Sequence, residues 1–265
     1  MPNTHTQFLA TAINAAAKAN QIIHASKSNF QVNAKGHQND LVTNVDQECE
    51  IAIIGIIKQH YPDHAIVGEE TGSNKSTADY CWIIDPIDGT TNFVHQYQQF
   101  STSIALQYKG ETIVGLIRDH TRDEVFSAVK SHGAYLNDKK IQISGHNELK
   151  NALIGTGFPC KRHDLLDWYL TTFREIFVEC SDMRRGGSVA IDLCQLACGR
   201  LDGFWEADLK PWDIAAGILI VTEAGGCAKN FQGGNDCLPS GNIIAGSASI
   251  VDALLNKIKT PSHAN

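Results

Sequence analysis

One segment of the sequence constrains the fold more than any other, because it runs from an apolar stretch straight into a series of polar residues. Residues 81–84 (Cys-Trp-Ile-Ile) are typical of a fully buried strand. Asp85 follows directly, Pro86 indicates a turn, and Asp88 lies two residues beyond it. Residues 89–91 (Gly-Thr-Thr) can open a short helix or a nest of backbone N–H groups that receives phosphate. The segment therefore predicts a buried sheet with carboxylates and an anion cradle at the end of one strand.

Carboxylates occupy similar positions at two other places in the chain. Glu69 and Glu70 follow the apolar residues 65–68. Asp213 stands near the start of a predicted helix that opens with Pro211. Carboxylates at strand ends converge and repel one another unless they are protonated or metal-bound, and hard oxygen ligands suit Mg²⁺. Together with the phosphate cradle, the pattern predicts metal-assisted hydrolysis of a phosphoester.

Each of these pieces, taken alone, has an ordinary structural explanation. An acidic pair such as Glu69 and Glu70 is usually a solvated loop, and Asp-Pro is a common turn. Asp213 at a helix start can simply favour the helix dipole. The joint occurrence of the pieces, in this order, is what favours a catalytic site.

The apolar periodicity predicts a chain in which helices and strands are mixed. Helices are expected at 8–23, 43–59, 164–177, 189–198, 211–224 and 250–258. Strands are expected at 65–68, 81–84, 101–108, 111–117, 125–129, 134–136, 152–157, 203–205 and 242–245. The first half is richer in antiparallel hairpins and the second in alternating helices and strands, so we predict a mixed α/β (α+β) fold.

Composition excludes several classes of protein. The chain has 265 residues and 43% hydrophobic residues, which excludes a disordered chain and allows one large domain or two small ones. A net charge of −7 argues against generic binding to nucleic acid or to anionic membranes. The longest apolar run, 51–57, is too short to span a membrane, and the start of the chain lacks the pattern of a signal peptide. The eight cysteines contain no Cys-x-x-Cys pair, so we expect reduced thiols and a cytoplasmic protein.

The motifs resemble those of the inositol monophosphatase family, the lithium-sensitive, Mg²⁺-dependent phosphatases. The matching pieces are residues 68–70 (Gly-Glu-Glu), 85–93 (Asp-Pro-Ile-Asp-Gly-Thr-Thr-Asn-Phe), 212–217 (Trp-Asp-Ile-Ala-Ala-Gly) and the segment 40–46. The resemblance extends from about residue 8 to about residue 258. It implies a layered α-β-α-β-α sandwich of the inositol monophosphatase/fructose-1,6-bisphosphatase type and usually a homodimer. We expect a single domain over residues 1–265, with an α+β half to about residue 145 and an α/β half from about residue 146.

The resemblance also implies roles for individual residues. The metal ligands would be Glu69, Asp85, the Ile87 carbonyl, Asp88 and Asp213, holding two or three Mg²⁺ ions. The catalytic group would be Glu70 and Thr90, which orient and activate the attacking water, together with Asp88. The backbone of Gly89 and Thr90 would bind phosphate, and the substrate would meet Asp88, Gly187, Ser188 and Glu206. A mobile loop that closes over the site would contain Lys35 and Asp40.

The charge of the substrate predicts the mechanism. A phosphate monoester is doubly anionic and repels hydroxide, so metal ions must neutralise it, activate a water and stabilise the leaving oxygen. Haloacid-dehalogenase phosphatases use an Asp-x-Asp motif with a nucleophilic first aspartate. Asp85 and Asp88 are three positions apart, which does not meet that pattern. We therefore predict direct displacement by water, and a trapped aspartyl-phosphate at Asp85 would contradict it.

The substrate and the partners are the less constrained part of the prediction. Residues 91–95 favour a small polyol phosphate, with myo-inositol 1-phosphate first, over the nucleotide branch of the superfamily. Sugar bisphosphates, nucleotides and histidinol phosphate remain as alternatives. A non-catalytic role is a further alternative, because some bacterial relatives are protein partners in ribosomal-RNA transcription (antitermination). Arg184 and Arg185 lie in the region that such relatives use, although two adjacent arginines can also be a solvated surface or an internal ion pair.

Overall fold

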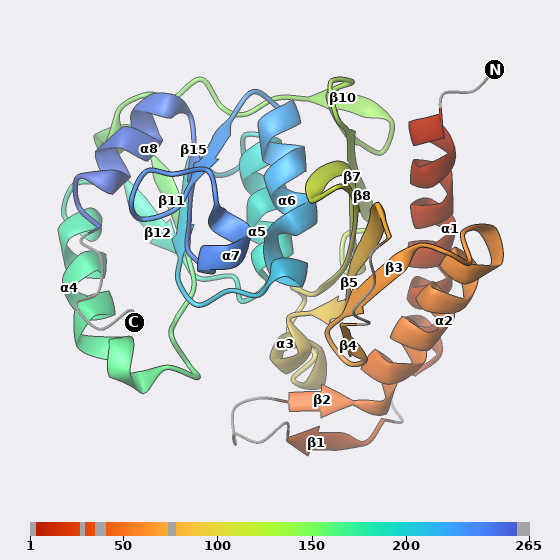
Figure 1. Ribbon diagram of the computed structural model, residues 1–265. Helices are drawn as coiled ribbons and strands as arrows, with labels where there is room; N and C mark the ends of the chain where they lie inside the picture. Colours follow the sequence, from red (N-terminus) through yellow and green to blue (C-terminus); the bar gives the residue numbers. More distant parts are fainter. Residues whose placement is uncertain (1–3, 27–29, 35–40, 74–77, 259–265) are drawn as a thin grey trace.

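The computed structural model describes residues 4–26, 30–34, 41–73 and 78–258, and its elements form five layers (Figure 1). Helices α1 (Thr4–Ala25) and α2 (Asn44–His60) cover one face of the larger sheet. Helices α5 (Val189–Ala197) and α6 (Pro211–Glu223) lie between the larger and the smaller sheet. Helices α4 (Leu166–Phe177) and α8 (Ala248–Leu255) cover the outer face of the smaller sheet. The predicted α-β-α-β-α layering is confirmed.

The larger sheet has eight strands within the described residues, in the order β10-β9-β8-β7-β6-β5-β3-β4. Its pairs are antiparallel except for the parallel pair β3 and β5. The bounds are β3 (Ala65–Gly68), β4 (Gly72–Ser73), β5 (Tyr80–Asp88), β6 (Ser101–Tyr108), β7 (Glu111–Asp119), β8 (Glu124–Val129), β9 (Ala134–Leu136) and β10 (Lys139–Ile141). Strands β3 and β5 are parallel neighbours, and Gly68 is paired with Ile84. The next residues along the two segments, Glu69 and Asp85, therefore lie side by side.

The smaller sheet has five strands in the described part of the chain, in the order β12-β11-β13-β15-β14. Strands β12, β11 and β13 are parallel, β15 runs antiparallel to β13, and the edge strand β14 runs antiparallel to β15. The bounds are β11 (Leu153–Thr156), β12 (Asp182–Arg184), β13 (Gly203–Glu206), β14 (Cys227–Lys229) and β15 (Ile243–Gly246). The end of β13 brings Glu206 toward the region between the two sheets.

Several short elements were not predicted. They include the antiparallel pair of β1 (Val32–Ala34) and β2 (Leu41–Thr43), and the single turns η1 (Leu149–Asn151), η2 (His163–Leu165) and α7 (Cys237–Ser240). The unpredicted strands β1, β2, β4, β10, β12 and β14 have two or three residues each. Segments this short have no measurable period, so the hydrophobic pattern cannot reveal them.

The turn predicted at Pro86 is wrong, because strand β5 continues through it to Asp88. Two residues of β5 lie between Asp85 and Asp88, whereas their partners Ser103 and Ser101 on β6 are separated by one. This bulge accommodates a residue without a backbone N–H and re-aims the side chains beside it. Both aspartates therefore belong to one strand rather than to a strand and a following loop.

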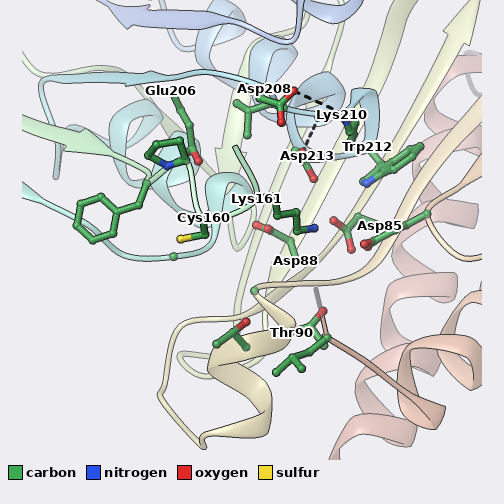
Figure 2. Close-up of a pocket in the computed structure, with 18 of the residues that line it drawn as sticks. Asp85, Asp88, Thr90, Cys160, Lys161, Glu206, Asp208, Lys210, Trp212 and Asp213 are labelled. Carbon is green, nitrogen blue, oxygen red and sulfur yellow. Dashed lines mark hydrogen bonds and ion pairs between the residues drawn. The ribbon is translucent and has the colours of Figure 1, made fainter. Parts of the chain in front are cut away.

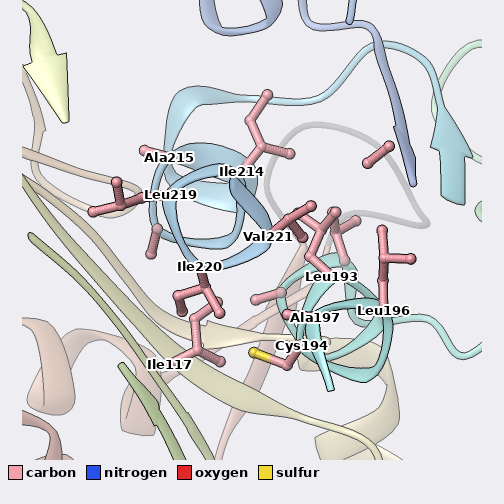
Figure 3. Packing of buried hydrophobic residues seen from close by; sticks show 14 of the residues in the cluster. Ile117, Leu193, Cys194, Leu196, Ala197, Ile214, Ala215, Leu219, Ile220 and Val221 are labelled. Atoms are coloured by element: carbon pink, nitrogen blue, oxygen red, sulfur yellow. The ribbon is translucent and has the colours of Figure 1, made fainter. Parts of the chain in front are cut away.

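The core between the sheets fixes helix α6 against the larger sheet. Figure 3 shows the buried side chains of α5 and α6 packed together and against Ile117 of β7. A Cβ atom at Gly115 of β7 would lie 2.8 Å from the carbonyl oxygen of Ala216, so α6 approaches that strand at backbone distance. At the start of α6, the Ser103 hydroxyl donates to the Trp212 carbonyl at 3.2 Å. Asp213 is thereby held beside the strand that carries Asp85.

Two further expectations concerned the cysteines, which were expected to be reduced thiols, and the apolar runs, which were expected to be too short to span a membrane. All eight cysteines are free thiols. No helix in the described part of the chain combines the length and the apolar character that crossing a membrane requires.

Candidate active site

A cavity of about 780 Å³ opens at the ends of β5 and β13 and at the starts of α3 (Thr90–Val94) and α6. Figure 2 shows the carboxylates of Asp85, Asp88 and Asp213 pointing into this cavity from β5 and α6. Oxygen atoms of these three carboxylates lie within 4.8 Å of one another. Glu69 and Ile87 also line the cavity. The predicted metal ligands thus converge in one place.

Backbone and hydroxyl donors fix two of these carboxylates. Asp88 Oδ2 accepts a hydrogen bond from the Ser188 hydroxyl at 2.5 Å and from the Ala190 N–H at 2.8 Å. Asp213 Oδ2 accepts from the Lys210 N–H at 2.6 Å, as part of a capping arrangement at the start of α6. Each carboxylate keeps its other oxygen for the cavity, which is the arrangement a metal ligand needs.

Burial and mutual repulsion disfavour the ionised form of the clustered carboxylates and so raise their pKa values. Burial raises the pKa of Asp85 well above its usual range, and the charges of Glu69, Asp88 and Asp213 raise it further. Burial likewise raises the pKa of Asp88 to about 6 and that of Asp213 to about 8. Asp85 Oδ1 is buried without a hydrogen-bond partner. A converging set of buried carboxylate oxygens, one of them unpaired, fits a divalent cation with hard oxygen ligands.

We expect Mg²⁺ to raise the melting temperature more at pH 8 than at pH 5.5. The raised pKa values of Asp88 (about 6) and Asp213 (about 8) mean that the folded protein holds protons that the unfolded chain has lost above about pH 4. Stability without metal therefore falls as the pH rises from about 4 toward 8, by at most about 1.4 kcal/mol per pH unit for each such group. Mg²⁺ binds the ionised carboxylates, so its stabilising effect grows as the protons leave.

Scanning calorimetry with and without Mg²⁺ at the two pH values measures this effect. Ca²⁺-free buffer with Na⁺ at matched ionic strength is the control for general screening. Equal shifts at both pH values would contradict the assignment of the cluster as a metal site.

Thr90 lies on the opposite wall of the cavity, at the first position of α3. Its hydroxyl lies 3.1 Å from Asp46 Oδ1 and 3.0 Å from the Ile87 carbonyl oxygen. Gly89 precedes it with a φ of +90°, a conformation that favours glycine. Among the described residues that line the cavity, Glu69 is present and Glu70 is not.

Asp46 is a residue of this site that sequence reasoning did not assign. It is fully buried on α2, and burial raises its pKa. Its Oδ2 also accepts from the Thr43 N–H at 2.8 Å and the Thr43 hydroxyl at 2.6 Å, which completes a capping box. The Thr43-x-x-Asp46 spacing indicates a helix cap. It gives no indication of the contact with Thr90, which lies 44 positions away in the sequence.

Some of the residues predicted to contact the substrate line the cavity, whereas another is buried behind it. Gly187 and Glu206 line the cavity. Ser188 caps α5 and is 1% exposed, with its hydroxyl directed at Asp88. Lys35 and Asp40, the predicted mobile-loop residues, lie outside the described residues.

The two adjacent arginines do not act as a unit. Arg184 forms an ion pair with Asp182 at 2.6 Å on strand β12. Arg185 lines the cavity, where its guanidinium lies 5.0 Å from the centre of the Phe158 ring. Alternation along an extended chain explains why neighbours point apart. Lys161 also lines the cavity beside the carboxylates and was not predicted.

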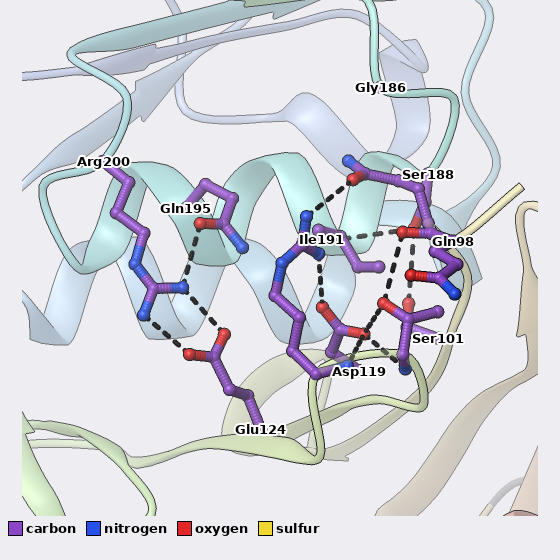
Figure 4. A network of polar contacts seen from close by, with 12 residues as sticks. Gln98, Ser101, Asp119, Glu124, Gly186, Ser188, Ile191, Gln195 and Arg200 are labelled. Carbon is purple, nitrogen blue, oxygen red and sulfur yellow. Dashed lines mark hydrogen bonds and ion pairs between the residues drawn. The ribbon is translucent and has the colours of Figure 1, made fainter.

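A polar network behind the cavity joins α5 to the larger sheet (Figure 4). The Ser101 and Ser188 hydroxyl oxygens are 3.3 Å apart, which links β6 to the residue that holds Asp88. Beyond the C-terminal end of α5, Arg200 binds Glu124 of β8 through two hydrogen bonds of 2.7 and 2.6 Å and donates to Gln195 of α5 at 3.1 Å. The network anchors α5 at both ends and so fixes Ser188 relative to Asp88.

Comparison with known proteins agrees with this geometry. Residues 4–262 match the inositol monophosphatase family. The chain is 44% identical over 256 residues to Nus factor SuhB of Pasteurella multocida, covering 95% of this chain and 96% of that protein. It superposes on the crystal structure of extragenic suppressor protein suhB from Bartonella henselae with a TM-score of 0.92 and 36% identity, covering 96% of this chain and 99% of that one. The inositol monophosphatase from Anabaena gives a TM-score of 0.87 and 34% identity, with 96% of each chain covered. The chain therefore belongs to the inositol monophosphatase family.

Proposed function

We propose that the protein is a Mg²⁺-dependent phosphomonoesterase that hydrolyses a small polyol phosphate, with myo-inositol 1-phosphate as the first candidate. The observation that carries the proposal is the set of three carboxylates, two buried and one half-buried, with oxygens within 4.8 Å of one another at the wall of the cavity. Membership of the inositol monophosphatase family supports the reaction class. The name of the Anabaena relative supports the polyol substrate.

Each metal-facing group has a defined part in this proposal. Mg²⁺, held by Glu69, Asp85, the Ile87 carbonyl, Asp88 and Asp213, supplies charge neutralisation for the phosphate, an acidified water and stabilisation of the leaving oxygen. We propose two or three ions per subunit. The backbone N–H groups of Gly89 and Thr90 bind the phosphate, and Glu70 helps to orient the attacking water.

Thr90 is suited to relay a proton from that water: its oxygen would accept the proton while its own hydroxyl proton passes to Asp46 Oδ1. Its single hydroxyl proton has two acceptors, Asp46 Oδ1 at 3.1 Å and the Ile87 carbonyl at 3.0 Å. A hydroxyl whose proton is directed away keeps its lone pairs for a proton from water. The pKa of Asp46 is raised by burial, so this carboxylate is a better proton acceptor than an exposed aspartate. Attack by water needs no phosphorylated side chain.

Glu206 is the proposed contact for the hydroxyl groups of the polyol, and Gly157 makes room for it. A Cβ atom at Gly157 would lie 1.8 Å from Glu206 Oε1. We expect Gly157→Ala to displace the carboxylate and lower kcat/KM for inositol 1-phosphate about 10- to 100-fold, the value of a hydrogen bond to a charged group. Hydrolysis of para-nitrophenyl phosphate, which has no polyol hydroxyls, should change much less.

Steady-state kinetics of the two substrates measure this prediction. Gly145→Ala is the matched control, because nothing lies within 4 Å of the added methyl group. Glu206→Gln combined with Gly157→Ala should cost little more than either change alone, since both remove the same contact. Additive losses would contradict the proposed link between the two residues.

The reaction class is tested by phosphate release from a panel of candidates, with and without Mg²⁺ and with and without Li⁺. The panel contains inositol 1-phosphate, fructose 1,6-bisphosphate, 2′-AMP, adenosine 3′,5′-bisphosphate and histidinol phosphate. We expect Mg²⁺-dependent, Li⁺-inhibited release that is fastest from inositol 1-phosphate. Absence of Mg²⁺-dependent release from every compound would overturn the proposal, and preference for a nucleotide would move the substrate to the neighbouring branch.

A second candidate function is that of a protein partner in transcription of ribosomal RNA. The name of the Pasteurella relative, Nus factor SuhB, favours it at 44% identity over 95% of this chain. Arg184 is an exposed arginine on the edge strand of the smaller sheet and so is accessible to a partner. The two functions use different groups and are compatible in one chain. We further propose, from the family resemblance, a single-domain subunit that forms a cytoplasmic homodimer.

A further inference from the structure

Helix α2 carries a second buried carboxylate, Glu50, whose side chain is 0% exposed. Its Oε2 accepts a hydrogen bond from the Glu70 N–H at 3.0 Å, and its Oε1 accepts one from the Thr71 N–H at 2.8 Å. A buried carboxylate is costly unless donors satisfy both oxygens. Here the donors are backbone groups of the segment that contains Glu69 and Glu70.

The chain wraps closely around the Glu50 carboxylate. A Cβ atom at Gly68 would lie 2.5 Å from Glu50 Cδ, so only a glycine fits at the end of β3. On the other side of the segment, the Glu69 N–H donates to the Ile84 carbonyl of β5 at 3.2 Å. The segment is therefore fixed between α2 and the residue that precedes Asp85.

The face of α2 that carries Glu50 also contacts Thr90, on the opposite wall of the cavity. Asp46 lies one turn before Glu50, and residues four apart share a face of a helix. Asp46 binds the Thr90 hydroxyl, whereas Glu50 binds the backbone at Glu70. One rigid helix thus sets the distance between the two groups proposed to orient the attacking water.

We propose that Glu50 is a positioning residue: its carboxylate holds the backbone of Glu70 and Thr71 and thereby keeps Glu69 at the wall of the metal site, with Glu70 beside it. The role of Glu69 and Glu70 in this statement rests on the proposed function. The position needs two acceptor oxygens, because each of them meets one N–H donor. A glutamine would present an NH₂ group to one of these donors.

Glu50→Gln tests the proposal, and Glu223→Gln is its matched control. Glu223 binds backbone in the same way, accepting from the Ser131 N–H and the Gly133 N–H at 2.7 Å each, but it joins α6 to a hairpin turn far from the cavity. Three measurements are made on the full chain: amide hydrogen exchange of Glu70 and Thr71 by NMR, Mg²⁺ binding by calorimetry, and phosphate release.

In Glu50→Gln we expect faster exchange at the Glu70 and Thr71 amides and Mg²⁺ affinity weaker by about 10- to 100-fold, as for other outer partners of metal ligands. The Mg²⁺ concentration for half-maximal activity should rise in parallel. Glu223→Gln should leave all three unchanged at a similar melting temperature. A purely structural role predicts that Glu50→Gln loses stability with unchanged Mg²⁺ affinity, and that result would overturn the proposal.

A second variant keeps the test decisive if Glu50→Gln is poorly folded. Gly55→Ala adds a good helix former at an exposed position of α2 where nothing lies within 4 Å, and it should restore stability to the double variant. Unchanged Mg²⁺ affinity in that double variant would equally overturn the role of Glu50. If the wild-type protein releases no phosphate at all, the proposed function fails, but amide exchange and Mg²⁺ binding still decide whether Glu50 holds the segment.

Discussion

Replacing Asp88 by asparagine should lower Mg²⁺-dependent phosphate release by at least about 10³-fold, because a lost metal ligand removes several kcal/mol of transition-state stabilisation. The amide oxygen can still accept from the Ser188 hydroxyl and the Ala190 N–H, the donors that hold Asp88 in place. The substitution also removes one negative charge from a group of carboxylates that repel one another. We therefore expect loss of activity with a folded protein, measured by phosphate release together with thermal unfolding.

Asp202→Asn is the control for removal of a buried carboxylate. Asp202 is 7% exposed and accepts from the Leu153 N–H at 2.7 Å in the smaller sheet, away from the cavity. This variant should lose stability and keep its rate. An Asp88→Asn protein that retained wild-type hydrolysis would contradict the proposed site.

Asp88→Asn also separates the two candidate functions. Binding to the transcription machinery needs an intact surface and no metal chemistry. A cellular phenotype of gene deletion that the Asp88→Asn protein fully restores would assign that phenotype to the partner role. A phenotype that it fails to restore would assign it to hydrolysis.

Gly89→Ala should cause the second large effect, at least about a 10²-fold loss of phosphate release, because small displacements of catalytic groups carry penalties of this size. The residue has a φ of +90°, and its Cβ atom would lie 2.9 Å from the Gln99 carbonyl oxygen and 3.2 Å from that of Gly187. Backbone atoms cannot rotate away, so the start of α3 must shift. Thr90 then leaves its place beside Asp46.

Gly110→Ala isolates the cost of the backbone conformation alone. Gly110 has a φ of +83° in the turn between β6 and β7, and nothing lies within 4 Å of its added methyl group. This control should lose about 1–2 kcal/mol of stability and keep its activity. Gly89→Ala should lose more stability than Gly110→Ala, as urea unfolding would measure. Equal stability and unimpaired hydrolysis in both variants would contradict the close packing at Gly89.

The sequence pattern could predict those residues whose position next to a strand or at a helix start itself indicates their place in the site. An apolar strand followed by Asp85 and Asp88 indicates a buried carboxylate pair whatever the rest of the fold is. Asp213 was predicted in the same way from a proline-opened helix. What the pattern could not predict is how they meet: the bulge in β5 and the hydrogen bond from Ser103 to the start of α6 depend on long-range pairing.

Other residues were missed because their local signal has a different meaning. Asp46 has the spacing of a helix cap, and Glu50 has that of an ordinary position in a helix. Their contacts with Thr90 and with the Glu70 N–H cross 44 and 20 positions of sequence. A single sequence carries no information about such pairs. The division of the chain at about residue 145 stays a prediction.

The position of α6 between the two sheets has a consequence for the newly made chain. The carboxylates that converge at the cavity come from positions as far apart as Asp85 and Asp213, and Asp213 is brought in only when α6 packs on β7. Until the ribosome has released α6, the emerging chain can contain a folded larger sheet but only part of the carboxylate cluster. The full carboxylate cluster therefore forms only at a late point in synthesis, and binding of Mg²⁺ to the proposed site would report completion of the fold.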